Sequence, residues 1–269
     1  EGRYLRGLAY EARGDSLLAA ALFGAARETE LLEARYRDGR DSEEPVETTP
    51  LLEEISEAES RLGELRWEGD RRILEDVTSW LFRWGRDHGT TAYGAAKALL
   101  GTIEPLEPLL TWLSGQYVND VSQLEKATEL APESPVAWRA LSNALAMTEP
   151  ERSEEALESA LKLLRRDDEP SPATEQLRAF DNLDYRPIDE KDLLATLAKL
   201  VYDGGRYDEA AELSAELIEM DPESLQGWQI HAQALTFSLK HDEAAAAYEK
   251  AIEHFDAAFE SDSLMLGGD

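Results

Sequence analysis

The stretch GRYDEAAELSAELIEMDP at residues 205–222 decides the fold, because KHDEAAAAYEKAIEHFD at 240–256 follows the same helical pattern. Small and apolar side chains return in matching places: Ala210 and Ala244, like Leu217 and Ala251, lie 34 residues apart. A fixed period of this length is typical of two-helix units, each of which buries its apolar face only against its neighbours. The pattern therefore predicts an all-α solenoid of helical hairpins, an α-α superhelix.

The residues at the repeated positions resemble those of the tetratricopeptide repeat, a two-helix unit with small residues where its helices meet. The resemblance implies the tetratricopeptide fold, and a protein that binds other proteins rather than one that catalyses a reaction. The best copy begins at Leu225 and carries the family's residue types at Trp228, Ala232, Leu235, Ala244, Tyr248 and Ala251.

Further copies of the pattern differ in quality. Good copies begin at Lys191 and at the N-terminus, in RGLAYEARGDSLLAAALFGAARE at residues 6–28, and a third begins at Pro135. A weaker copy before it contains Pro105 and Pro108, which should bend or shorten its first helix. About five copies, some degenerate, cover roughly two thirds of the chain.

These copies and the segments between them divide the chain. We expect an N-terminal repeat at 1–37, a linker with long amphipathic helices at 38–100, two repeats at 101–168, of which the first is degenerate, an insertion at 169–190, two well-formed repeats at 191–258 and a polar tail at 259–269.

The segment at 38–100 departs from the repeat pattern. It begins with DGRDSEEPVETTP, whose composition is typical of a loop or a disordered linker. Thr49 should then cap an amphipathic helix that extends to Leu65, and a second apolar face follows Gly69. These helices either pack between degenerate repeats or present aromatic side chains to a partner; the candidates for such a second interface are Trp80, Trp84 and Trp112, with Trp67 and Phe82.

The insertion at 169–190 should add a helix from about Pro172 to Leu183 and a turn at Pro187. Insertions in repeat proteins are loops on one face, and that face often binds the partner. We therefore expect this element either to border a binding surface or to be filler.

The charge of the chain is strongly negative, with 57 acidic and 27 basic residues and a formal net charge of -30. Such a surface repels phosphates, so nucleic acid and anionic membranes are not expected as partners. Lysine is scarce, and an acidic, lysine-poor composition resembles that of proteins from salt-accumulating halophiles. The alternatives are a mimic of DNA and a surface that attracts a basic partner.

Cysteine content, hydropathy and the first residue further limit the class of protein. Without cysteine there is neither a disulfide nor a thiolate metal site. The most apolar stretch, 92–113, contains Lys97, Glu104 and Glu107, so we expect a soluble, cytoplasmic protein without membrane insertion. The chain starts at Glu1 inside a repeat, which suggests a fragment or a processed chain, including one that has lost a signal peptide.

No motif in the sequence points to catalysis. GTTAYGAAK at 89–97 lacks the Gly-Lys-Ser/Thr of a phosphate-binding loop and is expected to be a helix of small residues. The four histidines show no metal-ligand spacing. We therefore expect no enzyme, no cofactor and no metal site.

The resemblance implies a concave groove lined by the first helix of each repeat. Arg139 and Asn143 would supply half of the carboxylate clamp of chaperone-binding members, but Asp192, Ala195 and Thr196 occupy the remaining positions, which argues against a complete clamp. Val136 and Ala195 would also face the groove. The predicted groove residues are Arg139, Asn143, Lys199, Tyr202, Gln226, Gln229, Gln233 and Phe237.

Two functions follow from this surface. The first is a non-catalytic protein–protein interaction module that holds a peptide, tail or helix of a partner in the groove. The alternative is a scaffolding or sensor segment of a larger polypeptide or multisubunit complex, with the chemistry located elsewhere.

Overall fold

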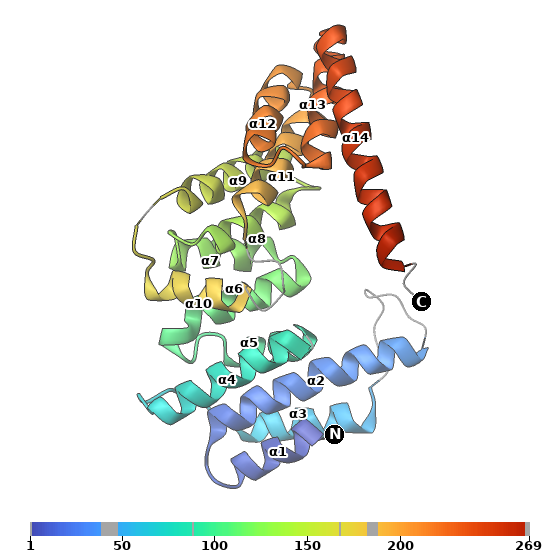
Figure 1. Cartoon of the computed structure of the whole chain (residues 1–269). Helices are drawn as coiled ribbons and strands as arrows, with labels where there is room; N and C mark the ends of the chain where they lie inside the picture. Colours follow the sequence, from blue (N-terminus) through green and yellow to red (C-terminus); the bar gives the residue numbers. More distant parts are fainter. Residues whose placement is uncertain (1, 39–47, 88, 167, 182–187, 267–269) are drawn as a thin grey trace. The chain divides into compact units, whose positions relative to one another are not determined.

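The computed structural model describes residues 2–38, 48–87, 89–166, 168–181 and 188–266, which form helices and turns with no strand among them (Figure 1). The elements are α1 (Gly2–Glu11), α2 (Ser16–Asp38), α3 (Pro50–Arg61), α4 (Arg71–Asp87), α5 (Gly89–Leu99), the 3-10 turn η1 (Glu104–Leu106), α6 (Glu107–Val118), α7 (Val121–Leu130), α8 (Pro135–Leu145), α9 (Pro150–Leu164), α10 (Pro172–Asp181), α11 (Glu190–Asp203), α12 (Tyr207–Met220), α13 (Leu225–Phe237) and α14 (His241–Leu266).

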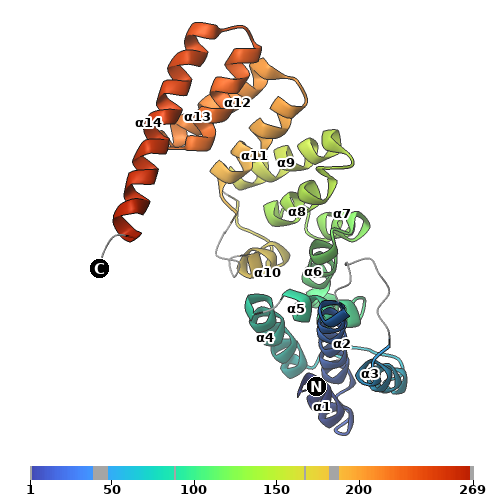
Figure 2. The ribbon, with the colours of Figure 1, turned by 90° about the vertical axis from the view of Figure 1, so that its right-hand side faces the viewer.

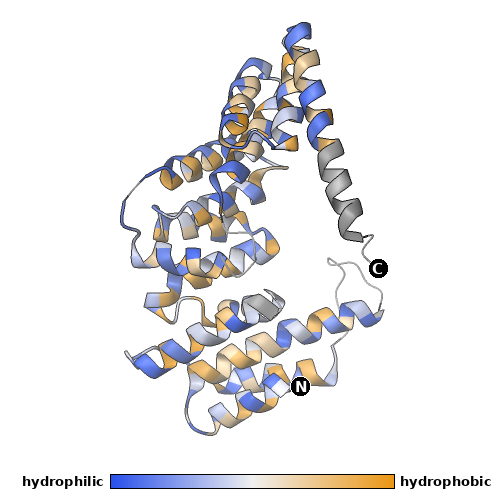
Figure 3. Cartoon of the chain, in the orientation of Figure 1, coloured by the Kyte–Doolittle hydropathy of each residue, from blue (hydrophilic) through white to orange (hydrophobic). Residues whose placement is uncertain are grey.

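The chain divides into two compact units. Unit 1 comprises residues 1–144 and 168–187, and unit 2 comprises 145–167 and 188–269. Within unit 2, α11 packs on α12, α12 on α13 and α13 on α14, as Figures 1 and 2 show. Most helices carry both hydrophobic and hydrophilic residues along their length (Figure 3), as expected when each buries one side against its neighbours. The predicted all-α helical hairpins are therefore present.

The ends of several helices follow from local sequence. Thr49 caps α3 as predicted, because its Oγ1 accepts a hydrogen bond from the Leu52 N–H at 3.2 Å. The helix ends at Arg61, before the predicted Leu65, and Gly63 follows with a φ of 68°. The weaker repeat also behaves as predicted: Pro105 lies in η1 and Pro108 in the first turn of α6, where a missing N–H is tolerated.

Helix α5 is the predicted helix of small residues, and it crosses α2 at very short range. A Cβ on Gly94 would lie 2.2 Å from the backbone oxygen of Gly24, and a Cβ on Gly24 would lie 2.2 Å from the Gly94 oxygen. Only residues without a side chain allow the two backbones to approach this closely. The GTTAYGAAK stretch therefore serves helix packing in unit 1.

Some predictions fall partly outside the described residues. These include most of the polar linker, at 39–47, and the end of the insertion, with Leu183 and Pro187. Within the described part, the insertion forms α10 from Pro172, as predicted. At the C-terminus α14 continues to Leu266, so the segment expected to be a polar tail is helical up to that residue.

Candidate functional site

The predicted groove residues belong to two different units. Arg139 and Asn143 lie on α8 in unit 1, whereas the other predicted positions lie on α11 and α13 in unit 2. The two sets are therefore described separately.

In unit 1, Arg139 is engaged by a carboxylate from the insertion. Its guanidinium donates to Oδ1 of Asp181, at the end of α10, and Asp181 is only 4% exposed. This pair neutralises a carboxylate that would otherwise be buried with its charge uncompensated. Asn143 is exposed, but Val136, expected to face the groove, is fully buried. The expectation for Val136 was wrong, and Arg139 is not the free cation that a carboxylate clamp would need.

In unit 2, three aromatic rings gather where α11, α12 and α13 meet. Phe237 stacks on Tyr207 with 4.8 Å between the ring centroids, and Tyr202 meets both rings edge-on at 5.5 and 5.9 Å. Phe237 remains 55% exposed. Tyr202 and Phe237 were predicted from the sequence as groove residues. Tyr207 was not, because it belongs to the second helix of its hairpin and lies outside the positions that the family pattern assigns to the groove.

Lys199 borders this cluster but is paired with a neighbouring carboxylate. Its Nζ donates to both oxygens of Asp203 at 2.6 and 2.5 Å and lies 5.9 Å from the centroid of the Tyr202 ring. Burial raises the pKa of Tyr202 above its ordinary value, and Tyr207 raises it further. Tyr202 is therefore a neutral phenol at physiological pH. Ala195, also expected in the groove, is buried, so that expectation was wrong.

One side of α13 carries three amides. Gln226, Gln229 and Gln233 are spaced three and four residues apart and share one side of the helix with Phe237. Gln226 and Gln229 are exposed, and within the described part of the chain no hydrogen bond engages the three side chains. We call Lys199, Tyr202, Tyr207, Gln226, Gln229, Gln233 and Phe237 together the α11–α13 face.

The predicted second interface is only partly at the surface. Trp80 and Trp84 are half-buried and stack at 5.6 Å, and Tyr10 meets Trp80 edge-on at 5.6 Å. Trp112, in contrast, is 2% exposed, because it packs edge-on against Phe180 of α10 at 5.7 Å. As a surface anchor, Trp112 was predicted wrongly.

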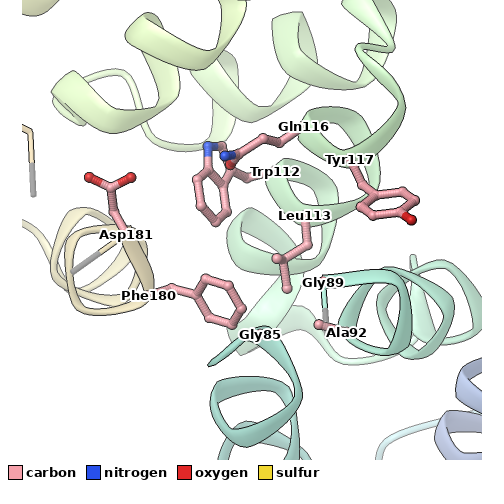
Figure 4. A pocket seen from close by; sticks show the side chains of 9 residues that line it. All are labelled: Gly85, Gly89, Ala92, Trp112, Leu113, Gln116, Tyr117, Phe180 and Asp181. Carbon is pink, nitrogen blue, oxygen red and sulfur yellow. The ribbon is translucent and has the colours of Figure 1, made fainter. Parts of the chain in front are cut away.

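A cavity of about 270 Å³ lies in unit 1 between the end of α4, the start of α5, α6 and α10 (Figure 4). In Figure 4, Phe180 extends from α10 toward Gly85 and Leu113, and the side chains of Trp112 and Gln116 both project from α6. The insertion therefore lines a cavity through Phe180 and Asp181, and that it borders a binding surface stays a prediction. Phe180 and Gln116 were missed, because only the packing of α10 on α6 brings them together.

Two further features were sought among the described residues and are absent there. No group of three or more His, Asp or Glu side chains in this part of the chain could hold a metal ion. The described residues also include no helix with both the length and the apolar content of a membrane span.

The comparisons with known proteins concern the fold. No family model matches the sequence, and no curated protein matches it. A crystal structure of the MamA protein matches 69% of this chain and 96% of its own, with a TM-score of 0.51 and 20% identity. The chain has a tetratricopeptide-like fold. A second MamA structure has a TM-score of 0.42 and 18% identity, and the match covers 73% of this chain and 99% of that one. The TPR domain of P58(IPK) has a TM-score of 0.26 and 17% identity, and the match covers 94% of this chain and 82% of that one.

Proposed function

We propose that this tetratricopeptide-like chain is a non-catalytic protein–protein interaction module, and that the α11–α13 face of unit 2 holds a peptide or helix of its partner. The observation that carries the proposal is a partly exposed aromatic cluster, with Phe237 at the surface, beside amides that make no hydrogen bond within the described residues. Phe237, packed on Tyr207 but more than half exposed, is a preordered ring that a partner's apolar side chain can cover.

The amides of α13 add directional contacts. Each glutamine side chain both donates and accepts, so it can pair with the N–H and C=O groups of an extended peptide backbone. Because these side chains make no hydrogen bonds within the described residues, binding would not break existing ones. The net charge of -30 favours a partner with basic flanks, mainly by accelerating encounter.

The scaffolding alternative has its own observation. Tyr248, Ile252 and Phe255 follow one another by four and three residues along α14 and are 40%, 60% and 54% exposed. This apolar stripe would suit contact with another subunit of a complex. The experiment must therefore separate the α11–α13 face from the α14 stripe.

Affinity capture from native cell extract, at matched salt, would test the proposal with the parent chain and three variants. We expect Phe237→Ala to lose the captured partner, with affinity reduced about 10-fold or more, as for a truncated aromatic anchor. Met147→Ala is the matched control, because Met147 is also an apolar side chain of unit 2 and is 93% exposed.

The third variant, Ile252→Ser, tests the scaffolding alternative. A partner retained by Phe237→Ala but lost by Ile252→Ser would replace the proposed function with scaffolding through α14. A partner retained equally by all variants would contradict both. The variant Arg139→Glu is unsuited to this test. It would place a second carboxylate beside the buried Asp181 and so destabilise unit 1.

A further inference from the structure

The contact between α12 and α13, which lie side by side in Figure 2, shows how neighbouring hairpins of unit 2 join. A Cβ on Gly227 of α13 would lie only 3.2 Å from Cγ1 of Ile218 on α12. Ser214 of α12 is fully buried, and its Oγ lies 3.1 Å from Nδ1 of His231 on α13. A glycine thus lets α13 approach closely, and small or apolar side chains of α12 form the surface on which it packs.

Helix α14 repeats this contact surface, but no helix packs on it in the described part of the chain. The 34-residue period places Tyr248 at the position of Ser214 and Ile252 at that of Ile218. Tyr248 and Ile252 are 40% and 60% exposed, whereas Ser214 is fully buried and Ile218 is half-buried. Within the described residues α14 packs closely only on α13. The α14 stripe is therefore a contact surface that lacks the first helix of a further hairpin.

Helix α1 is the first helix of its hairpin, and its alignment with α13 follows from the turns. Gly14, between α1 and α2, has a φ of 79°, and Leu239, between α13 and α14, has a φ of 61°. When these two turn residues are matched, Gly2 takes the position of Gly227. Helix α1 therefore carries the glycine through which α13 approaches α12.

The side of α1 that bears Gly2 is at the surface. In the same alignment Leu5 matches Ile230, and Ala9 matches Ala234. Ile230 and Ala234 are 3% and 0% exposed, whereas Leu5 is 55% exposed and Ala9 is exposed as well. Helix α13 packs on α11 and α12, and within the described residues α1 has no counterpart of these helices on this side. Helix α1 thus has the side that α14 lacks.

The charges of the two helices are complementary. Helix α1 contains two arginines and one glutamate, whereas residues 241–255 of α14 contain four carboxylates and one lysine. Arg3 and Arg6 make no ion pair within the described residues, nor does Glu249 of α14. In a chain with a net charge of -30, a basic helix with free arginines matches an acidic surface, and such charges accelerate encounter.

We propose that helix α1 of a second copy of this chain packs on the α14 stripe, as α13 packs on α12. Gly2 of one copy lies against Ile252 of the other, and Leu5 becomes buried. Because the two surfaces differ, the contact is heterologous, and a pair of copies keeps one surface of each kind for further copies. The contact uses no residue of the α11–α13 face, so it stands or falls independently of the proposed function. It assigns the α14 stripe to a second copy rather than to a different subunit.

Sedimentation velocity of the full chain at increasing concentration tests the contact. The buffer contains about 1 M NaCl, in which a Debye length of about 3 Å screens the repulsion between two acidic copies. We expect species larger than the monomer, and their proportion should grow with concentration. A chain that stays monomeric up to about 1 mM, where even a millimolar Kd would give substantial association, would overturn the proposal and leave the stripe to another polypeptide.

Two variants at exposed positions show which surfaces meet. Gly2→Phe should block α1, because the close approach needs a residue without a side chain; in the free chain a Cβ on Gly2 would meet nothing within 4 Å. Ile252→Lys should block α14, because an ammonium group would enter the contact. We expect each variant alone to stay monomeric at concentrations where the parent associates. An equimolar mixture should form dimers but nothing larger, because the two intact surfaces belong to different chains.

Val118→Lys is the matched control, since Val118 is 50% exposed and lies on α6, away from both helices. It should associate as the parent does. Association of Gly2→Phe alone, equal to that of the parent, would overturn the proposal, because it would indicate a symmetric contact between two α14 stripes or a contact elsewhere. A mixture of the two variants that stays monomeric would overturn it as well.

Discussion

Trp138 and Trp228 make the same kind of hydrogen bond at two places in the chain. Each indole Nε1 donates a hydrogen bond of 2.9 Å to the carbonyl of a proline six residues earlier, Pro132 and Pro222 respectively. In both cases the intervening Pro-Glu-Ser ends in a serine whose side chain accepts from the first turn of the next helix. One sequence pattern therefore fixes the entry into α8 and into α13.

We expect Trp228→Phe to lower the free energy of unfolding by about 0.5–1.5 kcal/mol, because it deletes this hydrogen bond while keeping an aromatic ring. Chemical denaturation monitored by circular dichroism would measure the loss, and Trp138→Phe should give a similar value. Trp80→Phe is the control, since the indole N–H of Trp80 makes no hydrogen bond to any residue that the structure describes. Equal stability of Trp228→Phe and the parent would show that the bond contributes nothing.

At the scale of the element, the crossing of α2 and α5 decides how unit 1 packs. The atom that a Cβ on Gly94 would meet at 2.2 Å is the backbone oxygen of Gly24, which cannot turn aside as a flexible side chain could. The two helices would have to separate along their contact.

We therefore expect Gly94→Ala to destabilise the protein by about 1–3 kcal/mol, the usual cost of overpacking, although alanine gains about 1 kcal/mol over glycine in helix propensity. Gly89→Ala, in the same helix, provides the contrast: its Cβ would meet only the Tyr117 ring at 3.7 Å, an ordinary contact. Thermal unfolding should show Tm falling for Gly94→Ala but not for Gly89→Ala. Equal Tm values would mean that the crossing is not tight.

At the scale of the whole molecule, charge is the dominant feature. The described ion pairs are mostly at the surface, where each contributes about 0.2–1 kcal/mol at best. Even if every Lys and Arg were paired, 57 acidic against 27 basic residues would leave 30 carboxylates without a cation. Salt weakens both the ion pairs and the repulsion between carboxylates. Because carboxylates are in excess, the weaker repulsion has the larger effect on stability.

Stability should accordingly rise between about 10 mM and about 1 M NaCl, as the Debye length falls from about 30 Å to about 3 Å. We expect Tm to increase by about 2 °C or more, the shift produced by about 1 kcal/mol in proteins of roughly 150–250 residues. Choline chloride at the same ionic strength should give the same increase if screening is the cause. A Tm independent of salt would indicate that carboxylate repulsion is negligible.

Features that depend on neighbouring residues could be predicted from the sequence alone. The repeat spacing, the Thr49 cap, the prolines at the start of α6, the small-residue helix α5 and the start of α10 could all be predicted, because propensity, capping and periodicity act within a few turns of helix. Which side chains are available for binding depends on contacts that form only in the folded protein. Periodicity assigns Val136, Ala195 and Trp112 to a side of a helix but does not say what covers that side. Likewise, Arg139 meets Asp181, 42 residues away, only because α10 packs on α6. Exposure and charge pairing depend on such distant contacts, and no local pattern in the chain encodes them.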